Sequence, residues 1–123
     1  MKKGVILLGH GSRREEANEE IRQMARMVME EDDEYFYETA FLSFASPDLA
    51  EAVARLAKKR VEKIIVMPIF LVRGNHIKCD IPQQMALIKN AHPDIEFVST
   101  RHLGADPAIA AIVRERIAEA VSL

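Results

Sequence analysis

Cysteine is almost absent from the sequence, since Cys79 is the only one among 123 residues. One cysteine excludes a disulfide within the chain and is typical of a protein kept in a reducing compartment. Long hydrophobic runs are absent too, because no stretch approaches the roughly 18 apolar residues that a membrane span requires. Gly9 and His10 interrupt the first apolar run, so we expect no secretory signal at the start. The sequence therefore predicts a cytoplasmic protein with no membrane partner.

An excess of one charge is also missing. The 17 basic and 19 acidic side chains leave a net charge of −2, which argues against attraction of the whole protein to nucleic acid. What the sequence does have is 49% apolar and 29% charged residues, enough for a buried core and a soluble surface. A length of 123 residues fits one domain, and we expect a single domain over residues 1–123.

The hydrophobic periodicity alternates between strand and helix patterns along the chain. Short apolar, β-branched or aromatic runs predict strands at 4–9, 35–44, 64–69 and 95–99. Helical spacing predicts helices from 15 to about 30, at 49–60, at 80–91 and from 107 onward. This alternation predicts an α/β fold, a three-layer sandwich around a four-stranded parallel sheet. Right-handed crossovers favour the order 2-1-3-4, with the first helix on one face and the next two on the other.

The helix starts and the apolar helix faces are visible in the same pattern. Three starts combine a capping side chain with a nearby proline: Ser46–Pro47, Asp80 with Pro82, and Asp106–Pro107. Three helices carry an apolar stripe at three- and four-residue spacing: Ala17, Ile21, Met24 and Val28; Leu49, Val53, Leu56 and Ala57; and Ile109, Ile112, Val113 and Ile117. The second stripe lies on one face of its helix, and we expect the third to be the buried face of the last helix.

Two histidines follow strands that this order makes neighbours. His10 comes directly after the strand at 4–9, and His76 follows the strand at 64–69. Parallel sheets bind ligands in the crevice between the carboxyl ends of two such strands. We therefore expect His10 and His76 to face each other as a functional pair. The alternative is an ordinary strand-to-helix loop with a solvated histidine.

The loops at the same edge of the predicted sheet are rich in arginine and lysine. The acidic residues nearby are explained as helix-start residues, so we expect a locally basic rim that suits an anionic ligand. The alternative is a set of solvated surface cations. The residues that we assign to ligand binding are Ser12, Arg13, Arg14, Arg73, Gly74, Lys78 and Arg101.

The remaining candidates are weaker. His92 ends a helix, where a cation is favoured for structural reasons. His102 follows the fourth strand and is a candidate for the rim by its place alone. Cys79 lies three residues after His76, but a lone cysteine is more often a loop or core residue than a metal ligand. The segment after the first strand is neither a Walker loop nor a dinucleotide-binding fingerprint.

Two motifs and two shorter elements carry a family resemblance. The first motif is Leu7-Leu8-Gly9-His10-Gly11-Ser12-Arg13 with Ala17-Asn18 following, and the second runs from Pro68 to Pro82. The second is similar to the pattern Pro-x-Phe-Leu-x-x-Gly-x-His-x-x-x-Asp-[Ile/Leu]-Pro of the short class II chelatases, the sirohydrochlorin chelatases. The resemblance extends over nearly the whole chain through Ala40-Phe41-Leu42 with Ser46-Pro47, and Leu103-Gly104. Ser43 departs from it, because many relatives have a glutamate there.

The resemblance implies a chelatase-like half domain that inserts a divalent metal into sirohydrochlorin without ATP, in cobalamin or tetrapyrrole biosynthesis. Cobalt is the first expectation, with nickel or iron as alternatives, and the metal is a substrate rather than a tightly bound cofactor. His10 and His76 then deliver the metal and accept the pyrrole protons, which suits neutral imidazole. Long relatives contain two such domains in tandem, so the resemblance implies a homodimer here.

Two other functions stay open at this point. The first is a non-catalytic carrier of metal or tetrapyrrole that uses the same residues. The second is a phosphoryl-transfer enzyme, with His10 as the nucleophile and Arg13 and Arg14 as a phosphate clamp. The sequence does not decide the physiological metal, because cobalt, nickel and iron share ligand preferences. The sequence also does not show which of the two histidines delivers the metal and which accepts the protons.

Overall fold

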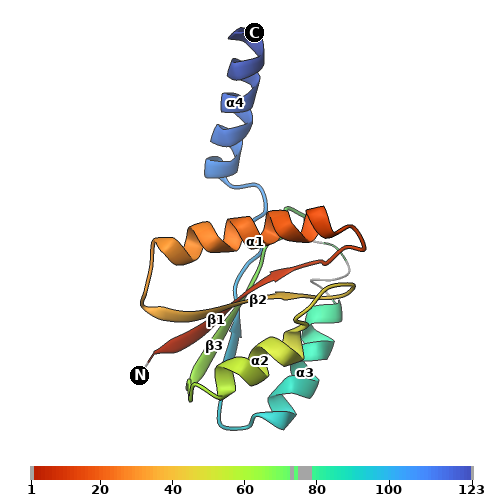
Figure 1. Cartoon of the computed structure of the whole chain (residues 1–123), viewed down its shortest axis with the longest axis vertical. Coiled ribbons are helices and arrows are strands. Elements are labelled where there is room, and N and C mark those ends of the chain that lie inside the picture. The colour runs from red at the N-terminus through yellow and green to blue at the C-terminus, as the bar shows by residue number, and fades with distance from the viewer. Residues whose placement is uncertain (1, 73, 75–78, 123) are drawn as a thin grey trace.

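A four-stranded parallel sheet in the order β2-β1-β3-β4 forms the centre of the computed structural model, which describes residues 2–72, 74 and 79–122 (Figure 1). Its strands are β1 (Lys3–Gly9), β2 (Tyr35–Phe41), β3 (Lys63–Pro68) and β4 (Glu96–Ser99). The helices are α1 (Glu15–Glu30), α2 (Leu49–Ala57), α3 (Ile81–Ala91) and α4 (Pro107–Ser122). The predicted α/β fold and strand order are confirmed. No helix in the described part of the chain is long and apolar enough to cross a membrane.

Strand β1 is the most deeply buried strand of the sheet. Its residues from Gly4 to Gly9 are buried, as a strand covered on both faces requires. It pairs along its whole length with β2, and from Gly4 to Leu8 with β3. The sheet therefore extends to both sides of the first predicted strand.

Helices cover the two faces of the sheet unequally, as the right-handed crossovers predict. Figure 1 shows α1 on one side of the sheet and α2 and α3 on the other. On the side of α2 and α3, Leu49, Val53 and Leu56 pack with Ile6 and Val66 in the larger core cluster. The predicted apolar face of α2 is thus the one that packs on the sheet. On the side of α1 the core is smaller, with three buried residues: Val5, Leu7 and Ala25.

The predicted second strand is too long, because pairing ends at Phe41 instead of continuing to residue 44. The next two residues still follow β1, since the N–H of Leu42 donates to the carbonyl oxygen of Gly9 and that of Ser43 to the carbonyl oxygen of His10. Phe44 then adopts a φ of 65°, in the left-handed region that no strand residue uses. The chain turns at this point toward α2.

The helix starts agree only in part with the predictions. The N-cap of α2 is Asp48, two residues after the predicted Ser46, because Asp48 accepts a hydrogen bond from the N–H of Glu51 while the Glu51 carboxylate accepts one from the N–H of Asp48. This reciprocal capping box stabilises the first turn more fully than a lone serine does. Asp80 precedes α3 but makes no capping hydrogen bond through its side chain. Asp106 caps α4 as predicted, by accepting from the N–H of Ala108.

The apolar stripe on α1 is only partly buried by the sheet. Ala17 and Ile21 are half-buried, and the Ile21 side chain lies 3.2 Å from the place where a Cβ on Gly9 would stand. Met24 and Val28 are 48% and 38% exposed, whereas the buried residues of this helix are Asn18 and Ala25. The periodicity therefore identified the apolar residues but not which of them the sheet covers.

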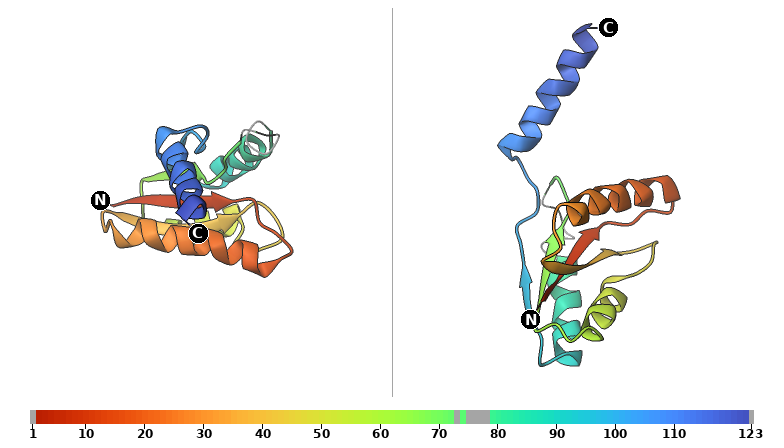
Figure 2. Two further views of the ribbon diagram at one scale, coloured as in Figure 1. Left: turned by 90° about the horizontal axis from the view of Figure 1, so that it is seen from above. Right: turned by 60° about the vertical axis from the view of Figure 1, so that its left-hand side comes forward.

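The prediction of a buried face on α4 is wrong for the single chain. Figures 1 and 2 show α4 continuing beyond the end of the sheet, away from the other helices. Ile112, Val113 and Ile117 are all about half exposed or more. The predicted apolar residues are present, but the described part of the chain provides no surface that buries Ile112, Val113 and Ile117.

We predict a pH dependence of stability from the turn between α1 and β2. The Tyr37 hydroxyl donates a 2.8 Å hydrogen bond to Asp32, and burial together with this bond raises the pKa of Tyr37 to about 12. An unfolded tyrosine has a pKa near 10, so this stabilisation is complete below about pH 10 and is lost as the pH rises toward 12. Tyr37→Phe should therefore flatten the fall in the free energy of unfolding over this window, measured by urea denaturation. An unchanged slope would contradict the assignment.

Candidate functional site

The carboxyl ends of the strands meet at one edge of the sheet, where the candidate site lies. Beyond the last paired residues, the N–H of Ile69 donates a 2.8 Å hydrogen bond to the carbonyl oxygen of Leu8. The N–H of Leu103, after β4, donates to the carbonyl oxygen of Phe70 at 3.0 Å. His10, Phe70 and Leu103 therefore belong to three adjacent segments at this edge, although they are far apart in the sequence.

His10 lies against the ring of Phe70. The two ring centroids are 3.8 Å apart and the planes differ by 14°, a stacked arrangement. Phe70 is 2% exposed, whereas His10 is exposed. A buried aromatic ring thus supports one face of the imidazole and restricts its orientation. Sequence reasoning included Phe70 only as the phenylalanine of the second motif and predicted no contact with His10.

Gly11 allows a close backbone contact next to His10. It has a φ of 85°, and a Cβ at this position would lie 1.7 Å from the carbonyl oxygen of Ser43. No side chain fits there, so only glycine allows the loop after β1 to lie this close to the loop after β2. The hydrogen bond from the N–H of Ser43 to the carbonyl oxygen of His10 holds the same contact at 3.1 Å. Ser43 is therefore a backbone neighbour of His10.

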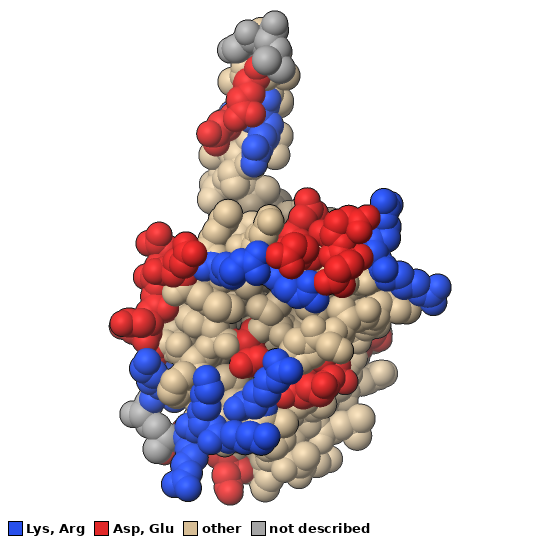
Figure 3. Space-filling model, in the orientation of Figure 1, with Lys and Arg blue, Asp and Glu red and all other residues tan. Residues whose placement is uncertain are grey.

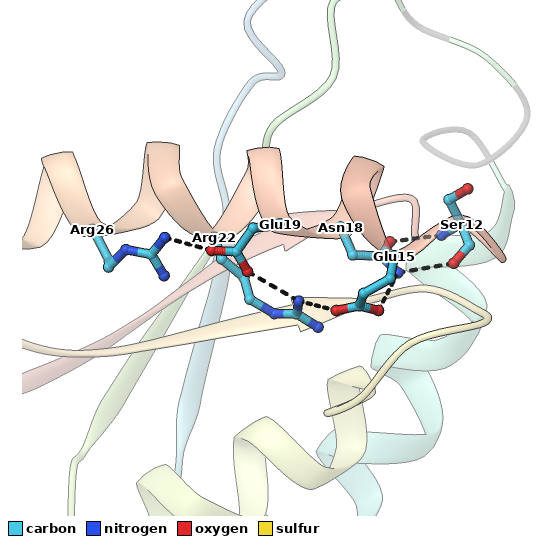
Figure 4. A network of polar contacts seen from close by, with 6 residues as sticks. All are labelled: Ser12, Glu15, Asn18, Glu19, Arg22 and Arg26. Carbon is cyan, nitrogen blue, oxygen red and sulfur yellow. Dashed lines mark hydrogen bonds and ion pairs between the residues drawn. The ribbon is translucent and has the colours of Figure 1, made fainter.

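Asn18 holds the next residue of the loop. Its Oδ1 accepts a 2.8 Å hydrogen bond from the N–H of Ser12, and its Nδ2 donates a 2.9 Å bond to the Ser12 carbonyl oxygen (Figure 4). Asn18 is 2% exposed and is the single buried polar side chain in the described ranges. Its only sequence signal was the Ala17-Asn18 pair that follows the first motif. Asn18 fixes the loop to the first turns of α1.

A series of ion pairs continues from the Asn18–Ser12 hydrogen bonds along one side of α1. Arg22 bonds both Glu15 and Glu19, and Arg26 bonds Glu19 (Figure 4). The hydrogen bond from Arg22, followed by the one from Asn18, lowers the pKa of Glu15. The hydrogen bond from Arg26 likewise lowers the pKa of Glu19. These carboxylates stay ionised, and they offset part of the positive charge near the predicted rim.

The predicted ligand-binding residues in the loop after β1 have different surroundings. Ser12 uses its Oγ to accept a hydrogen bond from the N–H of Arg14. Arg14 forms an exposed ion pair with Glu16, while the guanidinium of Arg13 lies 4.8 Å from the centroid of the Phe44 ring. In Figure 3, Lys and Arg side chains extend beyond the acidic cluster at the start of α1. The loop is therefore mixed in charge, with Arg13 held over an aromatic ring.

Two surface pockets lie at the ends of β3 and β4. One runs between α3 and β4, where Pro68, Phe97 and Met85 form an apolar wall with Lys89 beside it. The other follows β4 and is lined by the segment from Thr100 to Asp106, which includes Arg101 and His102. Thr100 lines both pockets. Arg101 thus lies at the predicted edge, and His102 lies beside it.

Several predicted site residues lie outside the described residues: Arg73, His76 and Lys78. The pairing of His76 with His10 therefore stays a prediction. Gly74 is described and exposed, and among the described residues outside its own chain neighbours no atom lies within 4 Å of the place where a Cβ would stand. Across residues 2–72, 74 and 79–122, no group of three His, Cys, Asp or Glu side chains is placed to hold a metal ion.

Comparison with known proteins adds independent findings. A family model described as CbiX matches residues 4–120. A sirohydrochlorin cobaltochelatase of Methanothermobacter thermautotrophicus is 39% identical, over 96% of this chain and 92% of its own length. A chloroplastic sirohydrochlorin ferrochelatase of Arabidopsis thaliana is 29% identical over 95% of this chain and 53% of its own. The sirohydrochlorin chelatase SirB of Bacillus subtilis subspecies spizizenii, in complex with cobalt, superposes with a TM-score of 0.91 at 25% identity, over 97% of this chain and 51% of that one.

We predict that Asn18→Ala loosens the loop that carries His10. Loss of both hydrogen bonds leaves the Ser12 backbone without its buried partners, which should cost about 1–3 kcal/mol in the free energy of unfolding. Hydrogen exchange at the Ser12 amide should become faster in the same variant.

Ser12→Ala is the matched control, because it removes only the Oγ that accepts from Arg14 and keeps both backbone bonds to Asn18. Equal exchange rates at residue 12 in both variants would show that Asn18 does not hold the loop.

Proposed function

Because the chain belongs to the CbiX family, we propose that it inserts a divalent metal into sirohydrochlorin, with cobalt as the metal. The observation that carries the proposal is the place of His10. It follows the central strand, stacks on buried Phe70, and lies in a loop locked by Gly11. This is the edge at which parallel sheets bind ligands, and the exposed imidazole has the chemistry that metal insertion needs.

The choice of cobalt rests on the names of relatives of nearly the same length. The Methanothermobacter protein and a Methanopyrus kandleri relative, which is 36% identical, are both named cobaltochelatases. The plant relative is named a ferrochelatase. Imidazole nitrogen binds cobalt, nickel and iron, so ligand type alone does not select among them. Nickel and iron are therefore tested beside cobalt.

The chemistry that we assign to His10 follows from its two capacities. A neutral imidazole nitrogen binds a divalent first-row ion, and the same nitrogen accepts a proton when the ion has left. Insertion of the ion into the macrocycle releases the protons of two pyrrole N–H groups, which a base must accept. We propose that His10 and His76 together deliver the metal and accept these protons. The support from Phe70 keeps the His10 ring in one orientation during this exchange.

The macrocycle would lie across the carboxyl edge of the sheet. Sirohydrochlorin carries eight carboxylates, which suit the basic residues that we assign to the rim, Arg13 and Arg101 among them. One chain offers one wall to this disc-shaped ligand, whereas binding sites bury most of their ligand's surface. We propose that a second copy related by a two-fold axis supplies the other wall, since two-fold dimers are the commonest oligomers.

We predict that His10→Ala and His76→Ala each lower the rate of insertion by on the order of 100-fold or more, the usual contribution of a general base. The assay follows the absorbance of sirohydrochlorin with cobalt, nickel or iron, with and without the protein. His92→Ala is the matched control, because His92 ends α3 and lies outside the proposed site. Circular dichroism should show an unchanged fold in all three variants, since loop truncations open no core cavity.

Wild-type rates in the His10 variant would reject the site. Binding of both substrates with no acceleration of insertion would show that the chain is a carrier. A phosphorylated His10 in protein exposed to a phosphoryl donor would favour the phosphoryl-transfer alternative.

We also predict that Arg13→Gln together with Arg101→Gln weakens sirohydrochlorin binding several-fold and flattens its salt dependence, because both cations face a polyanion. Lys58→Gln with Lys59→Gln is the matched control. These lysines follow α2, and replacing both changes the net charge by the same amount as replacing both arginines. The Lys59 ammonium lies over the ring of Phe36 in β2. Titrations at low and at high salt decide the result. Equal losses in both double variants would mean that only net charge matters.

A further inference from the structure

The loops at the two edges of the sheet differ in their exposed apolar side chains. At the amino edge, the described loops 31–34, 58–62 and 92–95 expose no large apolar side chain. At the carboxyl edge, four such side chains are exposed in the described loops: Phe44, Leu71, Val72 and Leu103. Single exposed apolar residues are normal, whereas a group of them at one edge indicates a binding surface.

The four residues come from adjacent segments on both sides of His10. The residue before Phe44 donates its N–H to the carbonyl oxygen of His10, and the loops that follow β1 and β2 lie side by side in Figure 1. On the other side, the His10 ring stacks on Phe70, which precedes Leu71 and accepts a hydrogen bond from the N–H of Leu103. The strand order β2-β1-β3-β4 therefore places His10 between Phe44 and the other three residues.

Phe44 is the most constrained of the four. Its φ of 65° lies in the left-handed region, which a bulky side chain rarely adopts. The residue is 62% exposed, so burial in the core does not explain this conformation. Backbone strain of this kind is concentrated at binding and catalytic sites. The ring lies at the surface, with the guanidinium of Arg13 4.8 Å from its centroid.

An apolar surface with cations at its margins fits the shape of a tetrapyrrole. The conjugated ring of such a ligand is flat and apolar on its two faces, and its carboxylates lie at the rim. Arg13 stands beside Phe44, and Arg101 lies two residues before Leu103. The two arginines are therefore at opposite ends of the apolar row, where the rim of a ligand lying on the row would meet them.

We propose that Phe44, Leu71, Val72 and Leu103 form an apolar platform that receives the flat face of the macrocycle, and that Phe44 is its specificity-determining residue. Because the ligand is the substrate assigned above, this role of Phe44 rests on the proposed function. An aromatic ring is a favourable partner for a flat conjugated ring, since the two can stack. The platform then selects for a flat ligand, while Arg13 and Arg101 select for its carboxylates.

Titration of the protein with sirohydrochlorin alone, at low and at high salt, tests this role without any metal. Phe44→Gly removes the ring, and glycine adopts a positive φ without strain, so the backbone of the loop is kept. We expect the dissociation constant to rise about tenfold or more at both salt concentrations, because a lost stacking contact is not screened by ions. Phe44→Tyr keeps the ring and should bind within about twofold of the wild type.

Leu87→Ala is the matched control, because it removes an apolar side chain that is 74% exposed on α3, outside the platform. It should leave sirohydrochlorin binding unchanged. Wild-type affinity in Phe44→Gly, or an equal loss in Phe44→Tyr, would overturn the role of Phe44. A loss accompanied by a weaker salt dependence would also overturn it, because Phe44 would then act only by holding Arg13.

Sedimentation velocity separates the platform from a contact between two copies of the chain. Loss of a dimer in Phe44→Gly but not in Leu87→Ala would show that a second copy covers these side chains, and would overturn the proposal. A wild-type chain that does not bind sirohydrochlorin would instead reject the proposed function, and the platform with it. A wild-type chain that binds sirohydrochlorin as tightly as Phe44→Gly does would reject the platform alone.

Discussion

The parallel pairing of β1 with strands on both sides is the constraint on which the structure depends. Because all neighbours run in the same direction, their carboxyl ends meet at one edge, and the residues after β1, β2, β3 and β4 become neighbours there. The backbone bonds that continue past the strand ends, such as Ile69 to Leu8 and Leu103 to Phe70, extend this order into the loops. The candidate site thus lies where backbone hydrogen bonds continue the order of the sheet into the loops.

In the proposed function, His10 binds a metal ion and then releases it. Such a group needs a fixed orientation more than a high affinity for the ion. The stacked Phe70 ring fixes the imidazole plane, and the Gly11–Ser43 contact fixes the backbone on which it stands. Asn18 adds the connection to α1, through two hydrogen bonds to Ser12. Together these contacts prepare the geometry before any substrate binds, so little ordering is left for the binding step.

Much of the fold could be predicted because its signals are local. The β-branched run at Ile64–Val66 and the apolar run of β1 mark strands. The right-handedness of the crossover connections then decides the order of the strands in the sheet. The rotation of α1 could not be predicted, because a stripe at Met24 and Val28 shows that a helix has an apolar side without showing what lies opposite. The buried amide of Asn18, which looks like a surface residue in the sequence, helps to set that rotation. His10 and Gly11 were recognisable in the first motif, whereas the support from Phe70 was not, because the second motif contains this phenylalanine without showing what its ring contacts.

Gly11 divides the loop after β1 into two parts with different freedom to vary. Up to Ser12 the backbone is clamped between the loop after β2 and the amide of Asn18, and a methyl group at residue 11 would collide with a carbonyl oxygen. Beyond Ser12, the side chains of Arg13 and Arg14 are exposed. Substitutions there alter the charge at this edge of the sheet and leave the histidine in place. Under the proposed function, a descendant of this chain can therefore change the anions that it prefers while it keeps the backbone that positions His10.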